Sequence, residues 1–378
     1  MASSEHSSHG SNDDHFHLPP VGGGESQRER FQAREIATVL SHYDLGVITN
    51  IREYRRGSRR SPKLRLDTER GTMILKRKSP GYLRARAEAG HALQTRAADA
   101  GVPVAALVPL RHGGTLLSLP DVAAGAGAER LYEIFEWVDG SRYERDPAQA
   151  EEAGAALARL HAAFAPVRRG DALPIGGFSD TDAVRRSLFL ADASASVRLD
   201  PAARAELGSL IDALDRHIGR IERKLGEKGL AEQRVSLCHG DFHPGNTLWL
   251  GVVLGAVIDF DSARHESVAA EVANALLQFS LKHRVGEDPD AWQVGLDGDR
   301  LRAFAEGYRS QPATVPHAEI APLIPWLMLS AVIAEAAAPI ARDGDFAGIP
   351  ALPFLRATVR LVDWIGERTR AVSSAFGA

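Results

Sequence analysis

The chain has 378 residues, of which 44% are hydrophobic, so it is long enough for one large two-lobed unit or two domains with a sizeable core. Its 45 basic and 49 acidic residues give a net charge of −4, which provides no general attraction to nucleic acid or to an anionic membrane. The single cysteine, Cys238, excludes an internal disulfide and is typical of a reducing cytoplasm. Because Cys238 follows the apolar Val235 and Leu237, core packing explains it better than a nucleophilic role.

Residues 1–28 are rich in Ser, Gly, His and Asp, and they carry too little apolar surface to offset the entropy of ordering. Four histidines in this segment offer ligands to a metal ion, but their irregular spacing favours a disordered tail. No apolar leader is visible, so a secretory signal is not expected. The most apolar stretch, 323–340, is interrupted by Pro325, Glu335 and Pro339, which favours a buried helix over a membrane span.

The first half of the chain predicts a helix followed by a small sheet. Ile36, Val39 and Leu40 fall at helical spacing. Alternating apolar residues then predict strands, and a further helix with Pro80 near its start lies between them. The predicted helices are 32–43 and 82–98, and the predicted strands are 47–49, 63–66, 72–76, 107–109, 115–119 and 130–137.

The segment 54–62, with the sequence YRRGSRRSP, joins the first two strands. Ser58, Ser61 and backbone N–H groups in it could meet phosphates, and its arginines favour an anionic ligand. Only one glycine, Gly57, is present, so a solvated basic hairpin is an equally good interpretation of this segment.

Beyond residue 139 the pattern is mostly helical. Ala153, Leu157, Leu160 and Phe164 form an apolar stripe, and His161 at its end is expected to be structural. Further helices are predicted within 182–225 and at 271–281, 303–308, 322–338 and 353–370.

The segment 238–263, CHGDFHPGNTLWLGVVLGAVIDFDSA, places Asp241, Asn246 and Asp259 in a fixed order. Mg²⁺ prefers hard oxygen ligands and usually takes one or two carboxylates from the protein, so Asn246 and Asp259 fit a metal site. Phosphoryl transfer also needs a carboxylate that positions the attacking hydroxyl and accepts its proton, and Asp241 fits that role. The alternative is an acidic turn followed by a buried strand that happens to end in Asp.

Two short strands are predicted inside this segment, at 247–250 and 256–260, separated by Gly251 and Gly255. Pro244 and Gly245 turn the chain after Asp241. This arrangement is expected to bring the second half of the segment back beside the first.

HGDFHPGN followed by VIDFDSA resembles the catalytic and metal loops of the aminoglycoside phosphotransferase and choline kinase-like small-molecule kinases, relatives of the protein kinases. The family pattern is matched at His239, Gly240, Asp241 and Asn246, then at 258–260. The resemblance implies an α+β, protein kinase-like fold with two lobes. These are a small antiparallel-sheet lobe at 29–138 and a larger, mostly helical lobe at 139–378.

The resemblance also implies a set of nucleotide-binding residues. Lys76 would contact the α- and β-phosphates and pair with Glu88, the one acidic residue of the predicted 82–98 helix. Lys78, two residues on and on the same strand face, competes with Lys76 for this role. At the hinge between the lobes, the backbone carbonyl of Glu136 and the backbone N–H of Val138 would hold adenine.

The function expected from the resemblance is transfer of a phosphoryl group from Mg-ATP to a hydroxyl of a small metabolite. The LSHYDLG segment, ILKR and IDFD most resemble the homoserine kinase-like branch, with an aminoglycoside or sugar-like alcohol as the runner-up. Candidates for the acceptor pocket are Asp261, Glu266 and Asn274. A catalytically silent nucleotide-binding protein is an alternative, whereas the short stretch after Asp259 argues against a protein kinase.

Overall fold

The computed structural model describes residues 29–55, 60–121, 125, 127–167, 170, 172–197, 199–282, 288–312 and 314–377. The predicted tail, residues 1–28, and the phosphate-loop candidate Ser58 lie outside the described residues.

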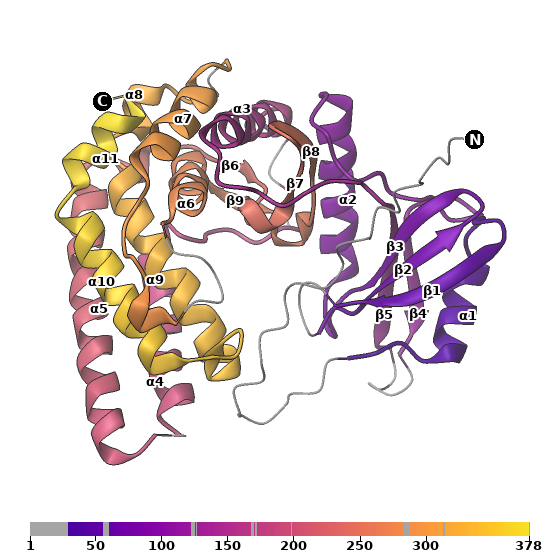
Figure 1. Cartoon of the computed structure of the whole chain (residues 1–378), viewed down its shortest axis with the longest axis horizontal. Helices are drawn as coiled ribbons and strands as arrows, with labels where there is room; N and C mark the ends of the chain where they lie inside the picture. The colour runs from indigo at the N-terminus through magenta and orange to yellow at the C-terminus, as the bar shows by residue number, and fades with distance from the viewer. Residues whose placement is uncertain are drawn as a thin grey trace, which may run out of the picture.

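The N-terminal lobe is built on a five-stranded antiparallel sheet with the strand order β1-β2-β3-β5-β4 (Figure 1). The predicted strand at 107–109 is wrong, because Leu107 forms only an isolated bridge to Phe135. The elements of this lobe are α1 (Ala33–Ser41), β1 (Ile48–Tyr54), β2 (Lys63–Thr68), β3 (Gly71–Arg77), α2 (Arg84–Asp99), β4 (Leu116–Pro120) and β5 (Glu129–Glu136).

Alternation along the strands gives this sheet two different faces. Leu64 and Leu66 of β2 and Leu75 of β3 are buried against Val39 of α1 and form the core of the lobe. The intervening residues, which include Lys63, therefore lie on the opposite face.

The C-terminal lobe is mostly helical, as predicted, and its helices surround α9. Within the described residues, α9 is the one helix long and apolar enough to cross a membrane, but 72% of its apolar window is buried inside the lobe, so it is a core helix. The helices are α3 (Pro147–Phe164), α4 (Thr181–Ser196), α5 (Pro201–Glu227), α6 (Val268–Ser280), α7 (Gly298–Arg309), α8 (His317–Ile320), α9 (Ile324–Asp343), α10 (Ala351–Gly366) and α11 (Thr369–Phe376).

Two glycines allow α3 and α7 to pack backbone to backbone. A Cβ atom at Gly154 would lie 2.1 Å from the carbonyl oxygen of Phe304, and one at Gly307 would lie 1.8 Å from that of Glu151. Any side chain at either position would therefore force the two helices apart.

The short strands of the C-terminal lobe carry the loops of the 238–263 segment: β6 (Val235–Cys238) pairs with β9 (Arg264–Ser267), and β7 (Thr247–Leu250) pairs with β8 (Val253–Val257). β8 begins earlier than the predicted 256–260, because the chain turns at Gly251 and Val252. A last pair, β10 (Asp345–Phe346) and β11 (Ile349–Pro350), joins α9 to α10.

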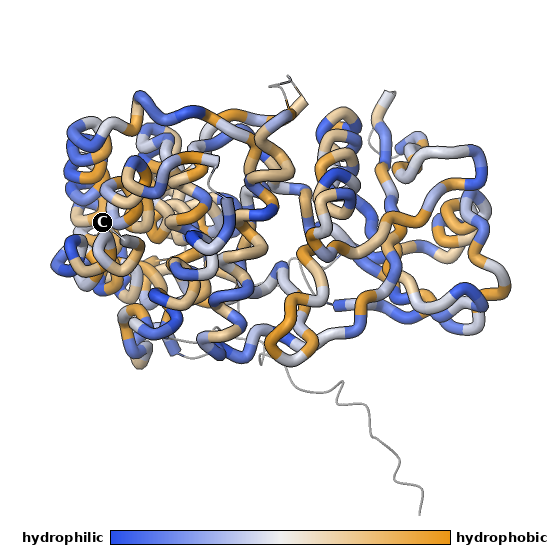
Figure 2. The backbone as a smooth tube through the Cα atoms, turned by 90° about the horizontal axis from the view of Figure 1, so that it is seen from above, coloured by the Kyte–Doolittle hydropathy of each residue, from blue (hydrophilic) through white to orange (hydrophobic). Residues whose placement is uncertain are grey.

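The lobes lie side by side (Figures 1 and 2), and they are linked by the packing of helix α2 and by the chain connection from β5 to α3. Helix α2 lies between them, and its Leu93 and Ala97 belong to the core of the C-terminal lobe. The connection from β5 to α3 runs past β7, where Ser141 and Trp249 exchange two backbone hydrogen bonds of 2.7 and 3.0 Å. The face of the sheet opposite α1 and the loops after β6 and β8 thus belong to one region.

Candidate active site

Asp241 lies in the loop between β6 and β7, and Asn246 fixes its carboxylate. The side-chain amide of Asn246 donates to both the backbone oxygen and the Oδ2 of Asp241, each at 2.9 Å. His243 approaches from the other side, with its Nε2 at 3.7 Å from Oδ1 of Asp241. Because Nδ1 of His243 accepts from the backbone N–H of Gly245, neutral His243 carries its proton on Nε2, facing the carboxylate.

Asp259 is brought to the same loop by the β7–β8 hairpin. The backbone N–H of Ile258 donates to the carbonyl of Asn246 at 3.0 Å. Asp259 has φ +67°, a left-handed conformation that few residues with a side chain adopt, so the surrounding contacts hold it there.

The side chain of His239 links the loop after β6 to the loop after β8. Its Nδ1 accepts from the backbone N–H of Asp241 at 3.3 Å, and its Nε2 contacts the carbonyl of Ile258 at 3.2 Å. This pattern requires a neutral imidazole with the proton on Nε2. Burial lowers the pKa of His239 below its usual value and favours this neutral form.

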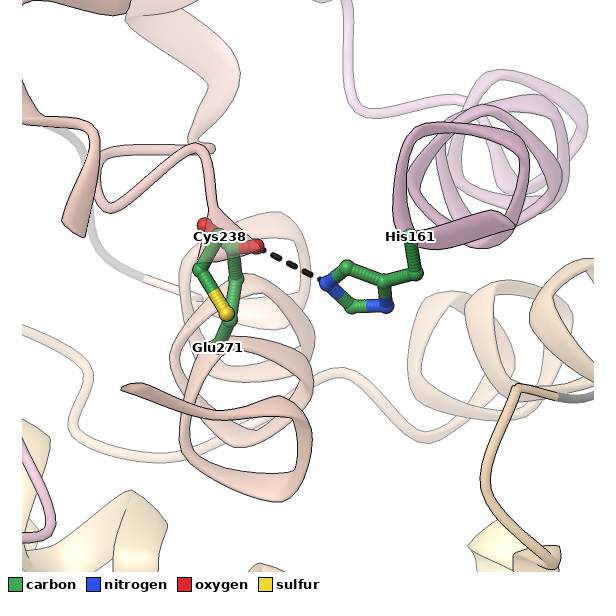
Figure 3. A group of neighbouring side chains, drawn as sticks. All are labelled: His161, Cys238 and Glu271. Atoms are coloured by element: carbon green, nitrogen blue, oxygen red, sulfur yellow. Dashed lines mark hydrogen bonds and ion pairs between the residues drawn. The ribbon is translucent and has the colours of Figure 1, made fainter. Parts of the chain in front are cut away.

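Glu271 of α6 holds the loop after β6 in place. It accepts from the backbone N–H groups of His239 at 3.1 Å and Gly240 at 2.5 Å, and it also binds Nε2 of His161 at 2.8 Å (Figure 3). Burial would raise the pKa of Glu271, but the hydrogen bond and charge of His161 lower it. The structural role predicted for His161 agrees with this arrangement, in which Tyr308 occupies its Nδ1 at 2.8 Å.

Cys238 is also buried beside Glu271. Burial, followed by the charge of Glu271, raises the pKa of its thiol well above the usual value. The thiol therefore stays protonated, and core packing, as predicted, describes it.

Arg264 ties the catalytic loop to the loop after β8. Its guanidinium donates to the carbonyl oxygens of Gly240 and, at 3.2 Å, Ser262. Gly240 has φ +79°, and a Cβ atom there would lie 2.1 Å from the Ser262 carbonyl, so only glycine fits.

Lys76, near the end of β3, reaches across to the C-terminal lobe. Its Nζ lies 2.9 Å from Oδ1 of Asp259 and 2.8 Å from Oδ2 of Asp261. Burial would lower the pKa of Lys76, but the carboxylates around it raise it well above its usual value. Burial would likewise raise the pKa of Asp259, but Lys76 and Lys63 lower it, so both groups are charged.

The predicted pairing of Lys76 with Glu88 is wrong in this structure. Glu88 lies on the exposed side of α2, where it pairs with Arg84 at 2.9 Å, because the residues of α2 that face the protein are Ala87, Gly90, His91 and those one turn on. The carboxylate beside Lys76 is Glu133 of β5, which is fully buried.

Glu133 and His91 are functional candidates that the sequence pattern did not reveal. Oε1 of Glu133 lies 2.6 Å from Nζ of Lys78 and 3.5 Å from that of Lys76, and Oε2 lies 2.6 Å from Nε2 of His91. Burial would raise the pKa of Glu133, but Lys78 and Lys76 lower it strongly. For His91, the signal available in the sequence was its position on the buried face of α2. For Glu133, it was a charged residue inside the apolar middle of strand β5.

The residues predicted to hold Mg²⁺ fit that ion. Asp259 is ionised, and no described residue hydrogen-bonds to its Oδ2 or to Oδ1 of Asn246. A carboxylate oxygen and an amide oxygen are thus available on adjoining loops, as a hard cation with further oxygen ligands requires.

The predicted hinge follows the last residue of β5. The N–H of Glu136 donates to the carbonyl of Ala106 at 2.8 Å. The N–H of Val138 makes no hydrogen bond with the described residues and is free for a ligand.

The three acceptor-pocket candidates lie elsewhere than expected. Asp261 forms ion pairs with Lys76 and Lys78 of the N-terminal lobe. Glu266 and Asn274 are buried behind the catalytic loop, where they line a cavity of about 10 Å³.

Glu335 of α9 is a half-buried carboxylate that the sequence did not single out for the acceptor site. It makes no hydrogen bond or ion pair with the described residues. Burial and the charge of Asp241 raise the pKa of Glu335 to about 7. The charge of Asp241 therefore acts on Glu335.

Comparison of the sequence with known proteins shows to which family the chain belongs. A model of the phosphotransferase enzyme family matches residues 50–314. The chain belongs to this family. The homoserine kinase of Bradyrhizobium diazoefficiens is 28% identical over 345 residues, covering 88% of this chain and 85% of the relative. That of Rhodospirillum rubrum is 30% identical over 250 residues, covering 64% of this chain and 68% of the relative.

Solved structures share the fold of this phosphotransferase. A microcompartment-associated aminopropanol kinase has a TM-score of 0.64 at 18% identity, covering 91% of this chain and 99% of that one. An amicoumacin kinase in complex with AMP-PNP and Ca²⁺ has a TM-score of 0.62 at 14% identity, covering 90% and 94%. The predicted two-lobed, kinase-like α+β fold is confirmed. As a member of the family, the chain is an ATP-dependent kinase that acts on a hydroxyl of a small molecule and uses a divalent metal such as Mg²⁺.

Proposed function

We propose that this phosphotransferase phosphorylates the hydroxyl of homoserine or a similar small amino alcohol in the cytoplasm. Seven curated relatives match the chain, and those compared above are homoserine kinases. The observation that carries the proposal is Asp241, whose carboxylate is held by Asn246 on the loop adjoining the ionised Asp259, and whose charge acts on the unpaired Glu335.

Asp241 is proposed to position the acceptor hydroxyl and accept its proton as the oxygen–phosphorus bond forms and the bond to the ADP oxygen breaks. Its Oδ2 is occupied by the amide of Asn246, so Oδ1 is the oxygen available to the hydroxyl. Because Asn246 already holds the carboxylate of Asp241, the base need not be oriented during the reaction. Such positioning and preorganised charge supply most of the acceleration of phosphoryl transfer.

Asn246 and Asp259 are proposed to hold Mg²⁺, which neutralises charge on the phosphates when bound. Lys76 would then exchange its contact with Asp259 for one with a phosphate, since both groups remain charged. Glu133 would keep the ammonium of Lys76 in place during this exchange.

The adenine ring is proposed to lie at the connection after β5, against the carbonyl of Glu136 and the N–H of Val138. The unused N–H of Val138 supports this assignment. We also propose that the lobes divide between residues 138 and 139, in this strand-free connection.

The acceptor is proposed to carry an amino group. A half-buried carboxylate without a partner, within the field of a second carboxylate, is costly unless a cation offsets the two charges. Glu335 and Asp241 supply this pair, and the ammonium of an amino alcohol fits it. An aminoglycoside also carries amino groups and is the second candidate, whereas a neutral sugar lacks them.

The experiment is ADP release from Mg-ATP with homoserine, ethanolamine, choline, an aminoglycoside and a simple sugar as acceptors. We expect turnover with homoserine or a comparable amino alcohol at the highest kcat/KM. Turnover that is highest with the sugar would contradict the proposal. ATP binding without turnover on any acceptor would favour a catalytically silent protein.

A further inference from the structure

A row of charged side chains crosses the sheet of the N-terminal lobe on the face opposite α1. Lys63 of β2 is directly opposite Lys76 of β3, and Lys76 is directly opposite Glu133 of β5. Residues opposite each other in an antiparallel sheet point to the same face, with Cβ atoms about 5 Å apart. Lys63 is therefore the neighbour of Lys76 on the side away from Glu133.

The three carboxylates of this region are all used by Lys76 and Lys78. Asp259 binds Lys76, Asp261 binds both lysines, and Glu133 lies between the two. The side chain of Lys63, by contrast, makes no hydrogen bond or ion pair with any described residue.

An unpaired ammonium at this position is unfavourable in the protein alone. Lys63 is half-buried, and a like charge directly across the ladder destabilises a sheet. Burial and the charge of Lys76 lower the pKa of Lys63, while Asp259 and Asp261 partly oppose this. An anion between Lys63 and Lys76 would remove both costs.

The position of Lys63 in the chain indicates which anion this is. Lys63 begins β2 and directly follows the 54–62 segment, for which contact with phosphates is one of the two interpretations given above. It lies close enough to Asp259 for their charges to interact. The triphosphate of ATP is the anion that the family reaction brings beside Lys76.

We propose that Lys63 is a second phosphate-binding lysine, which contacts the ATP phosphates alongside Lys76. Lys76 and Lys78 are already paired with carboxylates, which offset part of their positive charge. Lys63 would supply the further positive charge that the phosphates need. The assignment depends on ATP as the phosphoryl donor and is independent of the acceptor.

The test is the affinity of the full chain for ATP, with Mg²⁺, and for adenosine, measured by calorimetry for the wild type, Lys63→Met and Lys63→Arg. A hydrogen-bonded ion pair to phosphate predicts that Lys63→Met weakens ATP binding by about 10- to 100-fold and leaves adenosine binding unchanged. Lys63→Arg keeps the charge and should retain most of the affinity for ATP.

Arg70→Met is the matched control, because it removes one positive charge from the same lobe at the β2–β3 turn, where Arg70 pairs with Asp44. It should leave ATP binding unchanged. Lys63→Met should melt no lower than the wild type without nucleotide, since it removes an unpaired charge. Unchanged affinity for ATP in folded Lys63→Met, or an equal loss for adenosine, would overturn the proposal. Because binding is measured without an acceptor, failure of the homoserine assignment would not affect this result.

Discussion

Glu335 and Asp241 show how the charge of a loop acts on a side chain of a core helix that is distant in the chain. Helix α9 is apolar, yet its Glu335 lies close enough to Asp241 for their charges to interact. Glu335 makes no ion pair with the described residues, and Arg264, the cation whose charge acts on it, is already bonded to the Gly240 and Ser262 carbonyls. The arrangement stores electrostatic repulsion that a bound cation would relieve.

The raised pKa of Glu335 predicts a pH dependence of stability. The folded protein binds the Glu335 proton up to about pH 7, whereas the unfolded chain releases it near 4.5. Between these two pH values the folded state therefore holds more protons than the unfolded chain. The stability that protonated Glu335 contributes is lost as the pH rises through this window. In Glu335→Gln this contribution is absent, so the variant should lose less stability between pH 5 and pH 8 than the wild type.

Urea denaturation at both pH values measures this difference. An exposed carboxylate on α7, replaced in Glu306→Gln, is the control and should follow the wild type. Identical pH dependence in Glu335→Gln and wild type would contradict the placement of Glu335.

At the scale of elements, α6 supports the catalytic loop through a single side chain. Glu271→Ala would leave two backbone N–H groups and His161 without their acceptor in the interior. We expect a loss of about 3–5 kcal/mol in the free energy of unfolding, the range for breaking a buried charged network. Chemical denaturation checks this, with Glu306→Ala on the exposed face of α7 as control; a loss below about 1 kcal/mol would exclude the supporting role.

Helices α3 and α7 depend on glycine at their contact. Gly307→Ala would place a methyl group 1.8 Å from the Glu151 carbonyl, so we expect a loss of about 1–3 kcal/mol or more from overpacking. Gly208→Ala on α5, where the added methyl group meets nothing within 4 Å, should instead stabilise by about 0.5–1 kcal/mol. Thermal melts of the two variants distinguish these outcomes, and equal melting temperatures would show that α3 and α7 can separate freely.

The sequence predicted Asp241, Asn246 and Asp259 as one group because a short hairpin joins them and leaves few arrangements. It failed for the partner of Lys76, because that choice depends on the rotation of α2 about its axis. Small residues at Ala87 and Gly90 face the protein and turn Glu88 outward. Glu133 comes from a strand more than fifty residues along the chain, so only the sheet order brings it to Lys76.

At the scale of the whole molecule, a charged cluster joins the lobes across the site. Lys76 and Lys78 of the N-terminal lobe bind Asp259 and Asp261 of the C-terminal lobe. The two-lobed fold was predictable from the order of strands and helices and from the motif. The proposed acceptor site was not predictable, since Glu335 is brought near Asp241 only through the packing of α9, about ninety residues further along the chain.

The most direct test of the phosphoryl-transfer account is acceptor-dependent ADP release by the wild type and by Asp241→Asn, with ATP affinity measured in parallel. Asparagine keeps the size of the side chain and an oxygen that can accept from Asn246, but it cannot take a proton. The account predicts that transfer falls by about 10²- to 10⁴-fold while ATP affinity stays within a few-fold of the wild type. Unchanged turnover in Asp241→Asn would contradict it.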